Sequence, residues 1–149
     1  MMQGRMWMAA LALGLAVAGS SRADLTRALK EPNLEKRSQL ALENASAAYK
    51  AAREAYQKGE NERVATLAGE IQESVELANT SLTQTGKNPR KSPKWFKKAE
   101  IETRDLMKRL DTFEHEMGFN DRPMLEKVKA RVQQIHDELL VGLMEGKRK

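Results

Sequence analysis

Apolar residues recur three and four positions apart over four long stretches of this chain, and polar residues fill the positions between them. The stretches are about 34–58, 62–83, 93–117 and 123–144. Because an α-helix turns once in about 3.6 residues, this spacing places the apolar side chains of each stretch on one face. Gly59 and Gly118 separate the two members of each pair. The pattern therefore predicts four amphipathic helices arranged as two helical hairpins.

Alanine supplies most of the apolar face of the first predicted helix. The alanines recur at intervals of four and three residues, at Ala41, Ala45, Ala48, Ala52 and Ala55. Small side chains let a neighbouring helix approach to the near end of the usual ~8–10 Å separation. Gly59 supplies the left-handed turn that reverses the chain. Gly69, inside the second predicted helix, leads us to expect a close helix contact at that position.

Four such helices with mostly short connections predict an all-α fold, an antiparallel four-helix bundle in which 24–149 is a single domain. The composition agrees, since 9 Gly and 4 Pro among 149 residues disfavour a fold built of strands and turns. The narrow alanine face leaves one alternative open. In it the two hairpins are flatter and a second copy closes the core, which gives a homodimer.

Residues 1–23 have the features of a secretory signal peptide. Arg5 precedes an apolar run over 6–17, and 21–23 offers small residues at the two positions that signal peptidase reads. The run is shorter than the ~20 residues that span a bilayer. We therefore expect cleavage and export, with the bacterial periplasm as the destination. The alternative is an uncleaved segment that anchors the chain. Beyond the leader, 24–30 predicts a short helical turn.

The chain carries 26 basic and 21 acidic residues, a formal net charge of +5, and the bases are densest between the second and third predicted helices. The segment 87–98 contains no acid, and its bases are Lys87, Arg90, Lys91, Lys94, Lys97 and Lys98. With its two aromatic residues, this segment predicts a surface that binds an anion or an anionic partner. The other interpretation is a solvated loop that folds back against the acidic helix over 62–83. By helical spacing from Ala99 we expect Trp95 to face inward and Phe96 to be the exposed aromatic.

The sequence gives little support to a catalytic or metal-binding function. The two histidines, His115 and His136, lack the Glu-x-x-His spacing of di-metal bundles, because Thr112 and Gln133 occupy the positions three residues earlier. There is no nucleophile elbow, phosphate-binding glycine loop or His-Glu-x-x-His motif. The absence of cysteine excludes disulfides, thiolate metal sites and a lipid-modified cysteine.

Acidic residues are spaced to pair with bases on the outer faces of the predicted helices. Glu100 with Arg104 and Asp105 with Arg109 are examples, and we expect no acid on the buried faces. General acid–base catalysis would need buried carboxylates in a cavity. We therefore predict no enzyme activity and assign no catalytic residue, metal ion or cofactor. A bundle that carries a metal or cofactor through His115 or His136 is kept as an alternative.

These observations predict an exported, non-catalytic helical bundle that acts by binding or scaffolding in the cell envelope. Its partner would be an envelope protein or an anionic surface. The alternative within this class is a dedicated anion-binding module that uses 87–98, including Phe96, to engage phosphate headgroups or an acidic partner. No nucleic acid is expected as a partner, because an exported domain does not meet the genome.

Overall fold

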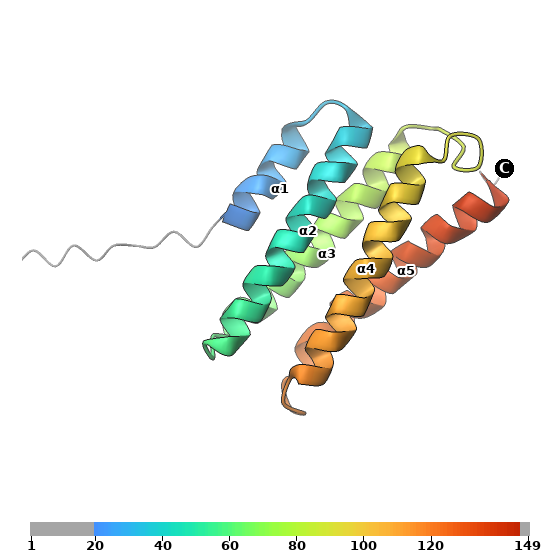
Figure 1. Cartoon of the computed structure of the whole chain (residues 1–149). Helices are drawn as coiled ribbons and strands as arrows, with labels where there is room; N and C mark the ends of the chain where they lie inside the picture. The colour runs from blue at the N-terminus through green and yellow to red at the C-terminus, as the bar shows by residue number, and fades with distance from the viewer. Residues whose placement is uncertain (1–19, 147–149) are drawn as a thin grey trace, which may run out of the picture.

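The computed structural model describes residues 20–146, which form five helices (Figure 1). They are α1 (Ser20–Lys30), α2 (Leu34–Gln57), α3 (Asn61–Gln84), α4 (Lys94–Glu116) and α5 (Pro123–Glu145). No strand occurs among these residues. The predicted all-α class is confirmed, and each long helix begins and ends within one residue of its predicted bounds. Residues 1–19 of the predicted leader lie outside the described part of the chain. The described part starts with α1 at Ser20.

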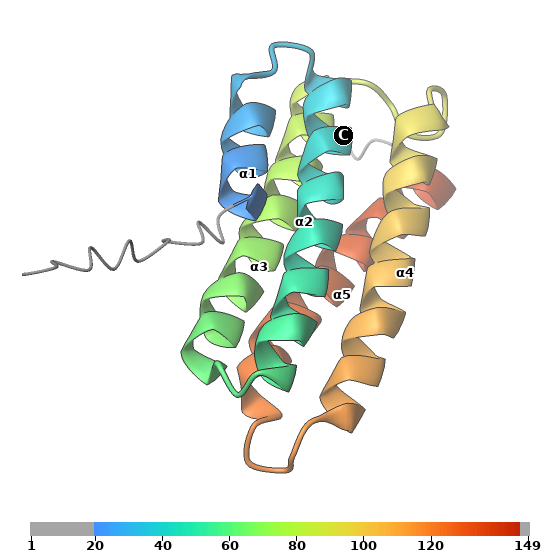
Figure 2. The same cartoon turned by 60° about the vertical axis from the view of Figure 1, so that its left-hand side comes forward.

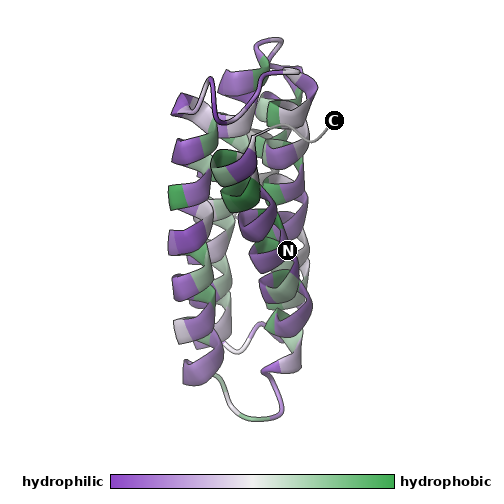
Figure 3. Ribbon diagram, turned by 90° about the vertical axis from the view of Figure 1, so that its right-hand side faces the viewer, coloured by the Kyte–Doolittle hydropathy of each residue, from purple (hydrophilic) through white to green (hydrophobic). Residues whose placement is uncertain are grey.

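The four long helices run alternately up and down around one core (Figures 1 and 2). α2 pairs with α3 and α4 with α5, while α3 also packs on α5 and α2 on α4. α1 lies against α2, on the side away from α4. Polar residues cover the outer surfaces, and apolar residues turn toward the neighbouring helices (Figure 3). The core is thus enclosed by the helices of a single chain, and association between copies stays a prediction.

The alanine face of α2 packs along α3. All five of its alanines are at most 2% exposed. The facing residues on α3 are also buried: Val64, Leu67, Ala68, Ile71, Val75, Ala78 and Leu82. Small side chains on one helix and larger aliphatic ones on the other fill the space without separating the backbones. We call this interface the alanine seam.

The turn at Gly59 holds the two helices of the alanine seam in register. Gly59 has a φ of 75°, in the left-handed region that glycine enters without strain. The amide of Glu60 donates to the carbonyl of Ala55 at 2.9 Å, and the amide of Gly59 donates to the carbonyl of Tyr56 at 3.0 Å. These bonds satisfy the last carbonyls of α2 in the way typical of a glycine-terminated helix.

Gly69 does not mark a close helix contact, and that expectation was wrong. The residue is exposed, and a Cβ added there would meet no atom within 4 Å. Its neighbour Ala68 is buried in the alanine seam, and one step along a helix turns the next position by about 100°. Gly69 therefore faces solvent.

Polar side chains form hydrogen bonds between elements at two places, one inside the core and one at its end. Near the middle of the alanine seam, the buried Asn44 donates from Nδ2 to the hydroxyl of Ser74 at 2.8 Å. At the end of the bundle, the hydroxyl of Tyr56 donates to Asp121 at 3.0 Å and accepts from the amide of Gly118 at 2.9 Å. The second group ties the α2–α3 turn to the connection between α4 and α5.

Enlarging one alanine of the seam tests the packing. Ala48 is fully buried, so Ala48→Leu is expected to lower the free energy of unfolding by about 1–3 kcal/mol through overpacking. Ala65→Leu, on the exposed face of α3, is the control and should change stability by less than about 0.5 kcal/mol. Urea denaturation followed by circular dichroism measures both values. Equal effects of the two substitutions would contradict close packing at Ala48.

The chain that begins at Asp24 is expected to fold as the full chain does. Every residue of the described core lies from Leu25 onward, so removal of the predicted leader deletes none of it. The expected result is strong helical circular dichroism with one cooperative thermal transition. A chain that stays unfolded after this removal would show that the first 23 residues contribute to the core.

Candidate functional site

The basic segment 87–98 comprises the connection between α3 and α4 and the first turns of α4. Asn88 organises the connection: its side-chain oxygen accepts from the amide of Arg90 at 2.9 Å. Its main-chain carbonyl accepts from the amides of Lys91 at 3.1 Å and Ser92 at 2.8 Å. The bases therefore project from a turn that is fixed by local hydrogen bonds.

Two glycines, Gly142 in the last turn of α5 and Gly146 just after it, let this connection lie directly on the C-terminal end of the helix. A Cβ at Gly142 would stand 3.2 Å from Cγ of Pro89, closer than ordinary van der Waals contact. At Gly146, where φ is 81°, a Cβ would stand 3.0 Å from the side-chain oxygen of Asn88. The three residues that follow Gly146 in the sequence are all basic.

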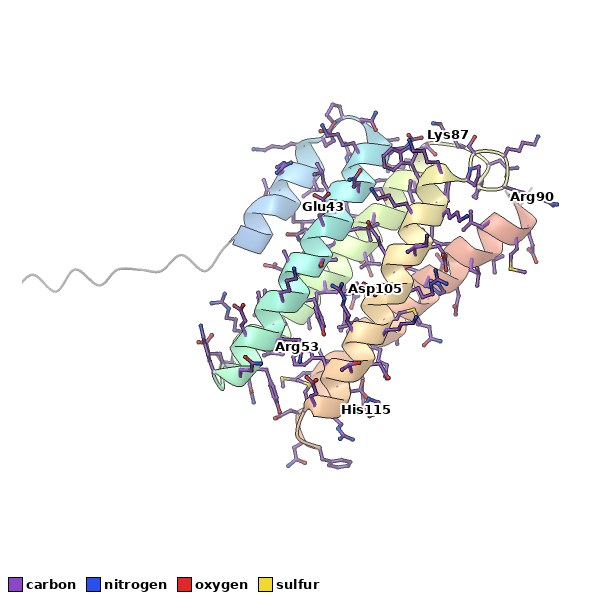
Figure 4. All side chains as sticks on the ribbon, in the orientation of Figure 1. Glu43, Arg53, Lys87, Arg90, Asp105 and His115 are labelled. Carbon is purple, nitrogen blue, oxygen red and sulfur yellow. The ribbon has the colours of Figure 1, made fainter. Side chains whose placement is uncertain are left out.

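Most bases of the segment are exposed and have no carboxylate partner among the side chains that the structure describes. These are Arg90, Lys91, Lys94 and Lys97. Lys87 forms an ion pair with Glu35 at the start of α2. Figure 4 shows Lys87 and Arg90 at the same end of the bundle, far from His115.

The alternative in which the loop folds back on the acidic helix α3 is not what the structure shows. Lys87 reaches Glu35 of α2 instead. On α3, Glu76 accepts from Arg131 of α5, with Nε to Oε1 at 2.9 Å. No ion pair joins an acid of α3 to a base of 87–98 among the described side chains.

The predicted orientation of the two aromatics was the wrong way round. Phe96 is 6% exposed and belongs to the core, whereas Trp95 is only partly buried. Both lie one helical turn before Ala99, at three and four positions, and the observed stripe continues through Phe96. Phe96 thus lies beneath the surface as part of the core and is not the exposed aromatic.

Trp95 carries two lysines over its ring. The Nζ of Lys94 is 5.2 Å from the ring centroid, and that of Lys98 is 5.6 Å away. Cations within about 6 Å of an indole are attracted to its face. The surface therefore presents an indole bordered by positive charge at the start of α4.

A buried polar contact between Glu100 of α4 and His136 of α5 contradicts the expectation that no acid enters the core. Glu100 and His136 are each 8% exposed. Nε2 of His136 lies 3.1 Å from Oε1 of Glu100, and Nε of Arg104 approaches the same oxygen at 3.6 Å. Glu100 therefore pairs with Arg104 as predicted, but from an inward position. It also follows that His136 is not a surface histidine.

His115 lies on the surface near the end of α4. Its Nδ1 is 2.7 Å from the main-chain oxygen of Asp111 and therefore donates to it. Asp111 in turn accepts from Nζ of Lys129 at 2.6 Å, and this hydrogen bond lowers the pKa of the aspartate. The structure does not bring His115 and His136 together. Among the described residues, no three His, Asp or Glu side chains are close enough to hold one metal ion.

An open groove of about 260 Å³ between α2 and α4 collects acidic side chains: Glu43, Glu102 and Asp105. Partial burial raises the pKa of Glu102; Lys98 opposes the shift and Glu43 adds to it. Asp105 pairs with Arg109 at 3.0 Å, as predicted. Glu102 thus lies in the groove at a position where burial disfavours its ionised form.

Comparisons with models of protein families, with curated proteins and with solved structures gave no match. None of the helices between residues 20 and 146 is long and apolar enough to cross a membrane.

Neutralising Glu102 is expected to stabilise the fold at neutral pH. A carboxyl group whose pKa is raised by folding favours the folded state below its unfolded pKa and loses that contribution as pH rises through the folded pKa. Glu102→Gln removes the ionised form, so its melting temperature should exceed that of the wild type at pH 7. The gain should stay below about 1 kcal/mol because solvent reaches the group.

The control is Glu73→Gln, an exposed carboxylate on α3. The advantage of Glu102→Gln should disappear when the pH falls below about 4, where the wild-type carboxyl is protonated. Thermal melts at the two pH values measure this. A Glu102→Gln variant that is less stable than the wild type at pH 7 would show that the carboxylate makes a favourable contact.

Proposed function

We propose that this protein is a non-catalytic helical bundle that acts by binding an anionic partner in the cell envelope through the basic segment 87–98. The observation that carries the proposal is a group of exposed bases that pair with no carboxylate among the described side chains: Arg90, Lys91, Lys94 and Lys97. Elsewhere in the described bundle, many bases on the helix faces pair with acids, as Arg131 does with Glu76.

Several features support binding through this segment. The connection is held by Asn88 and by the glycine contacts on α5, so its bases are presented without a large ordering cost. Exposed bases attract anions over about 8 Å at physiological salt. The surface is also built on Phe96, which anchors the start of α4 in the core.

The described cavities favour binding over catalysis. The buried histidine of α5 is packed against Glu100 and does not line an open site. The groove between α2 and α4 is lined by three acids, Arg109 and Ser46, and none of the described residues in its lining is a histidine that could activate the serine. Export is proposed from the N-terminal sequence. There an apolar run as long as the hydrophobic region of a signal peptide precedes the bundle.

Removal of the four bases tests the proposal. In the variant Arg90→Gln, Lys91→Gln, Lys94→Gln, Lys97→Gln, each lost charge near an anionic surface is worth about 1 kcal/mol, so affinity should fall about 100- to 1,000-fold. The measurement is retention on phosphocellulose across a salt gradient, together with the dissociation constant for inorganic polyphosphate.

The matched control neutralises four other exposed bases, distributed over the rest of the bundle: Lys50, Lys58, Lys108 and Lys127. It has the same net charge as the test variant. Equal loss of retention in the two variants would mean that overall charge, and not this segment, governs binding, and would overturn the proposal.

A further inference from the structure

We propose that the partner is an anionic lipid bilayer, and that the end of the bundle containing 87–98 docks flat on its headgroups. This inference rests on the proposed function, because it assigns a partner to the same surface. We call this region the basic end: it comprises the last turn of α1, the α1–α2 connection, the α3–α4 connection, the first turns of α4 and the last turn of α5. These segments lie at one end of the molecule (Figures 1 and 2).

The charge of the basic end comes from more than one connection. Lys30, the last residue of α1, is exposed there in addition to the bases of 87–98. The acids of the α1–α2 region are engaged, since Glu31 lies 3.8 Å from Lys36 and Glu35 pairs with Lys87. A surface with several separated positive points matches a plane of phosphates.

Exposed apolar side chains accompany these charges. Leu29 in the last turn of α1 is 55% exposed, and Met144 in the last turn of α5 is 67% exposed. Trp95 lies at the start of α4 with Lys94 and Lys98 over its ring. Tryptophan with flanking lysines is the combination found at membrane interfaces, where the ring sits among headgroups and the ammonium groups reach phosphate.

The apolar residues distinguish a bilayer from a soluble polyanion. A soluble phosphate polymer gains nothing from Leu29 or Met144, whereas a bilayer accepts them below its headgroups. The opposite end of the bundle has an exposed aromatic, Phe119 at 82%, but its charges are mixed, with Asp121 and Glu126 near Arg122. Only the basic end therefore combines apolar exposure with a strong excess of bases within the described chain.

Vesicle binding of the chain that begins at Asp24 tests the inference, with Trp95 as its sole tryptophan. Vesicles of phosphatidylcholine with about one third phosphatidylglycerol should bind the protein, whereas pure phosphatidylcholine should not. On binding, Trp95 emission should shift to the blue, and lipids brominated near the headgroup should quench it. High salt should reverse both signals.

A pair of apolar double variants separates insertion from charge. Leu29→Ser with Met144→Ser should weaken vesicle binding about tenfold and leave polyphosphate binding unchanged. The control, Ile101→Ser with Phe119→Ser, removes exposed apolar side chains away from the basic end and should bind vesicles as the wild type does. Circular dichroism melts establish that each variant is folded.

The outcomes distinguish this inference from the proposed function. Binding to polyphosphate without vesicle binding, or vesicle binding without a Trp95 shift, overturns docking of the basic end on lipid and leaves anion binding in place. Loss of vesicle binding in the Ile101/Phe119 control also overturns it. A protein that binds neither polyphosphate nor vesicles overturns both proposals.

Discussion

The contact between α2 and α3 is the constraint on which the rest of the structure depends. Five alanines on α2 leave room for the aliphatic side chains of α3, and burial of those side chains drives the association. The turn at Gly59 fixes where the two helices meet. Once this hairpin is formed, its remaining apolar surface is covered by α4 and α5 on one side and by α1 on the other.

Polar groups inside the bundle limit how these helices can be arranged. The bond from Asn44 to Ser74 is made at only one register of α2 against α3, because a shift by one residue would turn one partner away. The pair of Glu100 and His136 acts similarly between α4 and α5. Breaking such a pair leaves a buried polar group without its partner, which costs more than the bond itself contributes. These pairs therefore favour a single arrangement of the two hairpins.

The glycines at the end of α5 connect the fold to the proposed binding surface. Gly142 and Gly146 have no side chains to hold off Pro89 and Asn88, so the α3–α4 connection rests on the helix end. This contact brings the α3–α4 connection near the last turn of α5, where Met144 is exposed. Charge and apolar exposure at one end thus follow from packing at two glycine positions.

Helical periodicity was enough to predict the four long helices. Apolar residues spaced four and three apart, such as Leu106, Leu110 and Phe113, identify the buried face of a helix before its neighbouring helices are known. The same reasoning chose wrongly between Trp95 and Phe96, since Phe96 is the buried residue. Both are one turn from Ala99, and the choice depends on the rotation of α4 relative to the rest of the bundle.

Polar contacts between helices could also not be predicted from the sequence pattern. Glu100 and His136 border apolar stripes on separate helices, and only the packing angle of α4 on α5 brings them within 3.1 Å. Lys87 was recognised as part of a basic segment, but its partner Glu35 is 52 residues away in sequence. Local patterns predict which face of a helix is buried, while the pairing of polar groups depends on how whole helices are placed.

Native-state hydrogen exchange of the alanine seam tests the central claim most directly. If the contact between α2 and α3 holds the bundle together, the amides of 41–55 and 64–82 should exchange only by global unfolding, with the free energy obtained from urea denaturation. Exchange of these amides through local openings, at free energies several kcal/mol lower than the global value while α4 and α5 stay protected, would contradict it.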